Sequence, residues 1–117
     1  MYVDGYVLAV PKRNLSAYRR MASKAGKIWK EHGALEYLEC VGEDLNPKMA
    51  STFPKMVKAK PGETVFFSYI VFKSRADRDR INKKVMTDPR LASMMTAKPP
   101  FDLKRMAYGG FKPLVKF

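Results

Sequence analysis

The chain has 117 residues, a hydrophobic fraction of 46%, and a net charge of +12 from 23 Lys+Arg against 11 Asp+Glu. The hydrophobic fraction excludes a disordered chain, and the single cysteine excludes a scaffold held by intramolecular disulfides. The longest stretch without charged residues, Thr64–Phe72, is far shorter than the roughly 20 residues that span a membrane. Because the first residues lack the pattern of a signal peptide, we expect a small, basic, cytoplasmic domain covering residues 1–117.

The first third of the chain predicts a strand, a helix and a second strand. Residues 3–10 are rich in Val and Tyr and stop at Pro11, which is typical of a strand. Over 14–32, apolar residues recur at helical spacing, at Leu15, Tyr18, Met21, Ala22, Ala25, Ile28 and Trp29. Gly33 follows at the position where a glycine commonly ends a helix, and residues 34–41 then predict a second strand.

The remainder of the chain predicts two further strands and a second main helix. The segment 43–63 is irregular, could hold a short helix interrupted by Pro54, and ends in a turn at 60–63. A strand is predicted over 65–72, a helix over 75–87 that begins after Ser74, a short helix over 89–95, and a last strand over 104–111. This strand–helix–strand–strand–helix–strand order predicts a ferredoxin-like α+β fold with an antiparallel sheet and helices on one face.

Alternation along the strands assigns side chains to two faces of the sheet. The face under the helices is expected to carry Val3, Val7, Ala9, Leu38, Cys40, Phe66, Ile70, Phe72, Met106 and Tyr108. The open face is expected to carry Asp4, Tyr6, Leu8, Tyr37, Glu39, Val41, Phe67, Tyr69, Val71, Arg105 and Phe111. The second set is too apolar to remain in water, so we expect the same face of a second copy to cover it in a homodimer.

The polar members of this expected open face form the main candidate site. They are Asp4, Tyr6, Tyr37, Glu39, Tyr69 and Arg105. If the first and last strands are neighbours, Asp4 and Arg105 could meet. One interpretation is a paired polar network at a dimer interface, since a buried charge must be paired. The other is a pocket in which the carboxylates accept protons and Arg105 binds an anion.

Several segments resemble the YbaA-like family of bacterial proteins. They are MYVDGYV at 1–7, ECVGED at 39–44, FSYI at 67–70, DPR at 88–90 and FDLKRMAYGGF at 101–111. The resemblance covers nearly the whole chain and implies a dimeric α+β barrel. That superfamily includes small monooxygenases, haem-degrading enzymes, lactone isomerases and members without known activity. The resemblance therefore implies a fold and does not choose among activities.

Other chemistry-bearing residues have simpler structural interpretations. His32, the only histidine, precedes the helix-ending Gly33 and suits the negative end of the helix dipole, although a catalytic role is the alternative. Cys40 is expected to be buried under the helices as a small hydrophobic residue. With one His and one Cys we expect no zinc site, and no motif predicts a cofactor.

Basic residues on the outer side of the first helix are the second candidate site. Arg19, Arg20, Lys24 and Lys27 form a surface that could contact a nucleic acid or another anion, although a solvated basic face is the more ordinary interpretation. Three functions therefore remain open: a small-molecule-binding or cofactor-independent enzyme-like dimer, a basic nucleic-acid-binding accessory protein, and a structural or regulatory dimer without ligand.

Overall fold

The computed structural model describes residues 1–48, 50–95 and 98–117. The strands are β1 (Tyr2–Pro11), β2 (Glu36–Val41), β3 (Glu63–Phe72) and β4 (Ala107–Phe111). The helices are α1 (Leu15–Glu31), α2 (Phe53–Met56), α3 (Arg75–Met86) and α4 (Pro89–Met95), with 3₁₀ turns η1 (Lys12–Asn14) and η2 (Leu103–Arg105).

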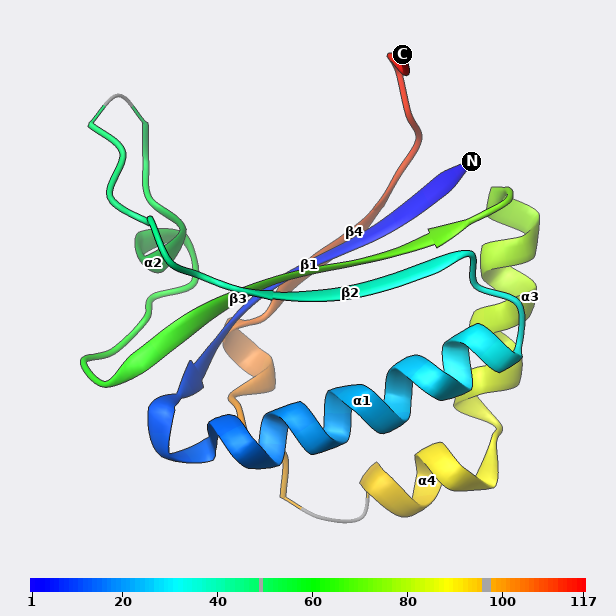
Figure 1. Ribbon diagram of the computed structural model, residues 1–117, viewed down its shortest axis with the longest axis horizontal. Helices are drawn as coiled ribbons and strands as arrows, with labels where there is room; N and C mark the ends of the chain where they lie inside the picture. The colour runs from blue at the N-terminus through cyan, green and yellow to red at the C-terminus, as the bar shows by residue number, and fades with distance from the viewer. Residues whose placement is uncertain (49, 96–97) are drawn as a thin grey trace.

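The four strands form one antiparallel sheet in the order β2-β3-β1-β4. Figure 1 shows α1, α3 and α4 on one side of this sheet, with α1 running beneath β2. The predicted α+β class and ferredoxin-like order are confirmed. Among the described residues, no helix has the length and apolar character needed to cross a membrane.

Local sequence features set the ends of the elements as predicted. The Ser74 side chain accepts a hydrogen bond from the backbone N–H of Asp77 and caps α3. Gly33, with φ +120°, leads out of α1, and Gly62, with φ +82°, forms the turn before β3. Pro54 does not interrupt α2, because it lies in the first turn, where its missing N–H would have no partner within the helix.

The strand register places the even-numbered residues of β1 under the helices. Tyr6 lies opposite Ser68 on β3 and opposite Tyr108 on β4, and Tyr37 lies opposite Ile70. The helix-covered face carries Asp4, Tyr6, Leu8, Val10, Tyr37, Glu39, Phe66, Ser68, Ile70, Phe72 and Tyr108.

The predicted faces were correct for β3 and for Tyr108, and wrong for β1 and β2. In β1 both alternating sets are apolar, so hydrophobicity does not choose between them. In β2 the apolar Leu38 and Cys40 face away from the helices, while Tyr37 and Glu39 face them. Cys40 is exposed, so the prediction of a buried cysteine is wrong.

The other face of the sheet is partly covered by the segment between β2 and β3. Leu45, Val57 and Ala59 of this segment pack against Val7, Ala9 and Val65. The rest, which we call the open face, includes the exposed side chains of Leu38, Cys40, Phe67 and Phe111, together with half-buried Tyr69. Figure 1 shows residues 42–48, which follow β2, and the C-terminal tail extending to this side of the sheet from its two ends.

Candidate functional site

A cavity of about 320 Å³ lies between the sheet and α1, and we call it the inner cavity. Its aromatic lining comes from β1, α1, β2, β4 and the segment before η2, and consists of Tyr6, Tyr18, Trp29, Tyr37, Phe101 and Tyr108. Its polar lining includes Glu39, Ser68 and Asn82. An apolar concave site with a few convergent polar groups is the usual form of a small-molecule site, and this volume lies at the lower end of the usual range.

Glu39 is the centre of the polar wall. Its carboxylate accepts hydrogen bonds from the hydroxyl of Tyr18, at 2.8 Å to Oε1 and 3.1 Å to Oε2, and from the hydroxyl of Tyr37 at 3.3 Å to Oε2. The Ser68 hydroxyl donates a further bond to Oε1. Among the ion pairs of residues 1–48, 50–95 and 98–117, none includes Glu39. Hydrogen bonds from three hydroxyl groups therefore stabilise the Glu39 carboxylate, and no ion pair among the described residues does so.

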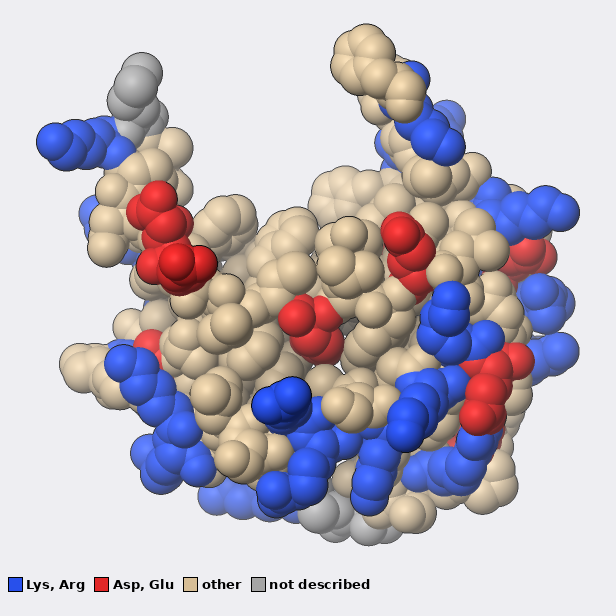
Figure 2. Space-filling model, in the orientation of Figure 1, with Lys and Arg blue, Asp and Glu red and all other residues tan. Residues whose placement is uncertain are grey.

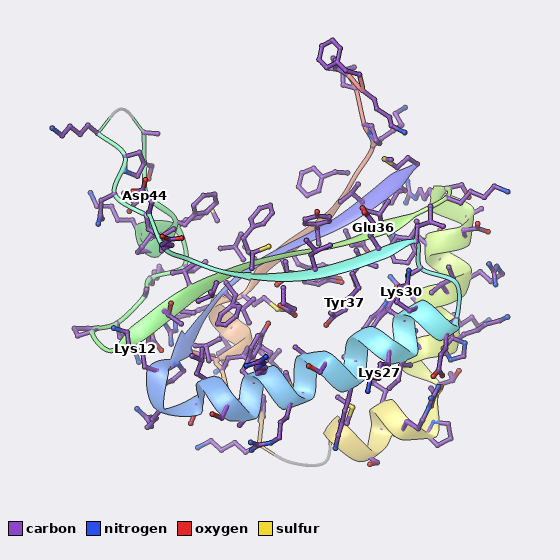
Figure 3. The ribbon with its side chains drawn as sticks, viewed as in Figure 1. Lys12, Lys27, Lys30, Glu36, Tyr37 and Asp44 are labelled. Carbon is purple, nitrogen blue, oxygen red and sulfur yellow. The ribbon has the colours of Figure 1, made fainter. Side chains whose placement is uncertain are left out.

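A glycine in α1 makes room for Tyr37. Tyr37 points from β2 toward α1 in Figure 3, and its ring lies against Gly26. A Cβ atom on Gly26 would be 2.8 Å from Cδ1 and 2.9 Å from Cε1 of the ring. Carbon atoms in contact usually lie about 3.5–4.0 Å apart, so only glycine allows this approach. The ring in turn packs near Trp29, with 6.1 Å between centroids.

The phenols around Glu39 stay protonated. Burial raises the pKa values of Tyr18 and Tyr37, and the charge and hydrogen bonding of Glu39 raise them further. Burial also raises the pKa of Tyr6, the third phenol on this wall. The three groups are neutral in the physiological range, so Tyr18 and Tyr37 remain hydrogen-bond donors to the carboxylate.

A second polar cluster lies behind Asn82. Asp4 is 2% exposed, pairs with Nε of Arg78 at 3.2 Å and accepts a hydrogen bond from Nδ2 of Asn82 at 3.2 Å. The indole N–H of Trp29 donates to Oδ1 of Asn82 at 3.0 Å, which links this cluster to the inner cavity. Burial raises the pKa of Asp4, while Asn82 and Arg78 act in the opposite direction. These bonds orient Asn82 at the cavity wall.

Arg105 does not meet Asp4, and this prediction is wrong. Its guanidinium makes two bonds of 2.7 Å to the carboxylate of Glu63 and one of 3.1 Å to Asp102. Asp4 pairs with Gly110 in the sheet, whereas Arg105 lies in η2, before β4 begins. Arg105 is therefore engaged at the other end of β1 and does not line the inner cavity.

The predicted site residues thus separate into three places. Tyr6, Tyr37 and Glu39 line the inner cavity, and Asp4 supports it through Asn82. Tyr69 lies on the open face, as predicted, and Arg105 lies in the pair with Glu63. Their roles in binding or catalysis stay predictions.

Sequence reasoning missed Tyr18, Ser68 and Asn82. Tyr18 belongs to the apolar stripe of α1 and was assigned to the core, where its ring does pack against Phe66. Ser68 lies in a strand that is otherwise strongly apolar, and a hydroxyl in such a strand could have indicated a buried partner. Asn82 lies among charged residues of α3, where the sequence pattern does not distinguish it.

One basic residue of α1 lines a second depression. Arg19 lines a groove of about 460 Å³ between α1 and β2, the outer groove, whose inner wall is again Tyr18, Tyr37 and Glu39. Figure 2 shows an acidic side chain in a hollow at the middle of this face, with Lys and Arg side chains along α1 below it. Arg20, Lys24 and Lys27 are exposed on the same helix, and their nucleic-acid role stays a prediction.

His32 lies outside both depressions. Its Nε2 atom is 2.8 Å from Oδ2 of Asp88, at the start of α4, and its backbone N–H continues the hydrogen bonding of α1. Asp88 also bonds the Arg90 guanidinium. His32 therefore ties the end of α1 to α4, which favours the structural interpretation. Within the described part of the chain, no group of three His, Cys, Asp or Glu side chains could hold a metal ion.

Residues 1–103 match the family described as a protein of unknown function, DUF1428. The chain is also 45% identical over 114 residues to a protein of Escherichia coli K12 described as uncharacterized protein YbaA, covering 97% of each chain. The protein belongs to this family. The resemblance found in the sequence segments is confirmed.

Solved structures show the same fold. A protein of Agrobacterium tumefaciens has a TM-score of 0.60 at 19% identity, covering 97% of this chain and 93% of its own. A NIPSNAP domain protein of Burkholderia xenovorans has a TM-score of 0.58 at 9% identity, covering 97% and 94%. A protein from an uncultured marine organism, described as dimeric and ferredoxin-like, has a TM-score of 0.57 at 5% identity, covering 100% and 98%. At these identities the likeness concerns the fold.

Proposed function

We propose that the protein binds a small organic molecule in the inner cavity, with Glu39 as the residue that contacts it. One observation carries the proposal: the Glu39 carboxylate, which forms no ion pair with the described residues, lies on the wall of an aromatic cavity and is held in place by three hydroxyl groups. The Glu39 side chain is half-buried, and removing a carboxylate even partly from water costs free energy that an apolar residue at this position would not cost. The polar wall is more simply explained as a binding surface.

The outer groove supports access to this carboxylate. Glu39, Tyr18 and Tyr37 line both the outer groove and the inner cavity, so they form the partition between them. A ligand that enters from the α1–β2 side can reach Glu39 through the outer groove, which Arg19 also lines. A carboxylate in this position can accept a hydrogen bond or a proton from the ligand, which is the first requirement of a general base.

The test is a binding screen with a matched pair of variants. We expect Glu39→Gln to lose or change the binding of compounds that the native protein retains, because the variant removes the charge and keeps the shape. Glu36→Gln is the control, since Glu36 lies on the same strand and is exposed (Figure 3). A panel of neutral, anionic and cationic aromatic fragments is followed by native mass spectrometry and by the fluorescence of Trp29, the only tryptophan. A panel without a single binder, or binders indifferent to Glu39→Gln, would contradict the proposal.

We further propose that the open face is covered by a second copy of the chain. Phe67 is 46% exposed and Phe111 is 62% exposed on this face, and the tail adds Leu114 and Phe117, both exposed. Residues 42–48, which follow β2, and the tail stand on either side of the face in Figure 1, which suits a second sheet lying between them. Apolar surface of this extent on a monomer usually marks an interface, and a self-complementary face gives a two-fold dimer.

The oligomeric state tests this second proposal. We expect a dimer mass by light scattering, and a monomer for Phe67→Glu, because the new charge would be buried against the partner sheet. Leu103→Glu is the control, since Leu103 is 52% exposed and lies in η2, away from the open face. A monomeric native protein, or a Phe67→Glu variant that dimerises like the control, would rule out this interface.

A further inference from the structure

The hydroxyl groups around Glu39 already donate their O–H hydrogens to its carboxylate. Each hydroxyl has one O–H donor and two acceptor lone pairs, and those of Tyr18, Tyr37 and Ser68 donate to the Glu39 carboxylate. What these groups can still offer a ligand is their oxygen lone pairs. The carboxylate itself is acceptor-only when ionised. This part of the wall therefore favours a ligand that donates hydrogen bonds.

The other polar groups of the wall reinforce this preference. The indole N–H of Trp29 donates to Asn82, and the amide Nδ2 of Asn82 donates to Asp4. The indole N–H and one N–H of the Asn82 amide are therefore used within the protein, and the second N–H of Asn82 is the one amide donor of the described lining. The hydroxyls of Tyr6 and Tyr108 are the further hydrogen-bonding groups of the lining, and each can accept as well as donate.

The charges around the inner cavity also favour some ligands over others, because they disfavour an anion. Glu39 is the one carboxylate in its described lining, and that lining contains neither Lys nor Arg. Arg78 is engaged by Asp4 and by the Tyr2 hydroxyl, and no ion pair of the described residues joins Arg19 to Glu39. A bound anion would face a carboxylate without a compensating cation, which is unfavourable in a site of low polarity.

We propose that the ligand is a small organic cation, a protonated amine with an aromatic or apolar body. This inference rests on the proposed function and specifies its ligand class. The ammonium group donates hydrogen bonds to Glu39 and to the hydroxyl oxygens beside it. Its positive charge balances the negative charge of the carboxylate. The rings of Tyr37 and Trp29 line the same cavity, and aromatic rings attract cations within about 6 Å of the ring centroid. The cavity of about 320 Å³ limits the body to a small molecule.

A matched pair of probes separates charge from shape. 2-Phenylethylamine and 2-phenylethanol differ only in an ammonium or a hydroxyl on the same body, and neither absorbs at the wavelengths that excite Trp29. We titrate each at neutral pH and follow Trp29 emission, with native mass spectrometry to confirm one molecule per chain. We expect the native protein to bind the amine at least tenfold more tightly than the alcohol.

The variants then assign the preference to Glu39. In Glu39→Gln the ratio of the two dissociation constants should fall to about one, and in Glu36→Gln it should stay at the native value. Equal binding of the two probes by the native protein, tighter binding of the alcohol, or a preference that survives in Glu39→Gln would overturn the ligand class. If neither probe binds while the fragment panel yields a neutral or anionic binder, the ligand class fails and the proposed function stands. If the whole panel fails as well, the proposed function fails with it. The native comparison decides the question even if Glu39→Gln does not fold.

Discussion

Replacing Gly26 by alanine tests the packing that positions Tyr37. In an exposed helix interior this change normally stabilises a protein by about 1 kcal/mol, because glycine loses more backbone entropy on folding. Here the new Cβ would lie 2.8 and 2.9 Å from two ring carbons of Tyr37. The ring would have to move by about 0.7 Å to reach a normal contact distance. The helical gain is thus opposed by a clash inside the site.

The expected balance is a net loss. Overpacking of this kind costs about 1–3 kcal/mol. Loss of the hydrogen bond from Tyr37 to Glu39, already 3.3 Å long, adds about 1 kcal/mol. Subtracting the helical gain of about 1 kcal/mol leaves Gly26→Ala destabilised by about 1–3 kcal/mol. The measurement is the free energy of unfolding from urea titrations followed by Trp29 fluorescence.

A double-mutant cycle makes the reasoning refutable. In a Tyr37→Leu background the ring is absent, so Gly26→Ala should stabilise the protein by about 1 kcal/mol. Ser23→Ala, an exposed change on the same helix, controls for helix propensity and should stabilise both backgrounds slightly. If Gly26→Ala raised the stability equally with and without the Tyr37 ring, the close approach would not exist in solution.

Two further predictions concern pH. The hydrogen bonds from Arg105 lower the pKa of Glu63 from 4.5 to about 2. The stabilisation that Glu63 gives the folded state is therefore complete above pH 4.5 and is lost as the pH falls toward 2. Glu63→Gln should flatten the pH dependence of unfolding in that window, and an unchanged acid profile would contradict the ion pair of Glu63 with Arg105. Burial and Glu39 raise the pKa values of Tyr18 and Tyr37. The stabilisation that the two neutral phenols give the folded state is therefore complete below pH 10 and is lost as the pH rises above it. Tyrosinate absorbance should therefore show a late component that appears only with unfolding and shrinks in a Tyr18→Phe, Tyr37→Phe variant; ionisation of all six tyrosines before unfolding would refute it.

The sequence predicted most of the fold because the relevant signals are local. The apolar spacing of α1, the Ser74 cap and the turn around Gly62 depend on residues within a few positions of each other. Six elements in a fixed order then leave few topologies, and the ferredoxin-like arrangement is among the commonest. The family resemblance, carried by short segments spread along the chain, agrees with that result.

The sequence by itself determined the elements, their order and a set of polar residues worth examining, including Glu39, Tyr37 and Tyr6. Only the tertiary structure decided which face of the sheet those residues occupy. In β1 both faces are apolar, and a one-residue change of register exchanges them at little cost in hydrophobic pattern. The observed register pairs Tyr6 with Ser68 and places the ring of Tyr37 against Gly26 of α1. In this register Tyr18, Ser68 and Asn82 line the same cavity. These contacts join residues far apart in the chain, and no local pattern encodes them.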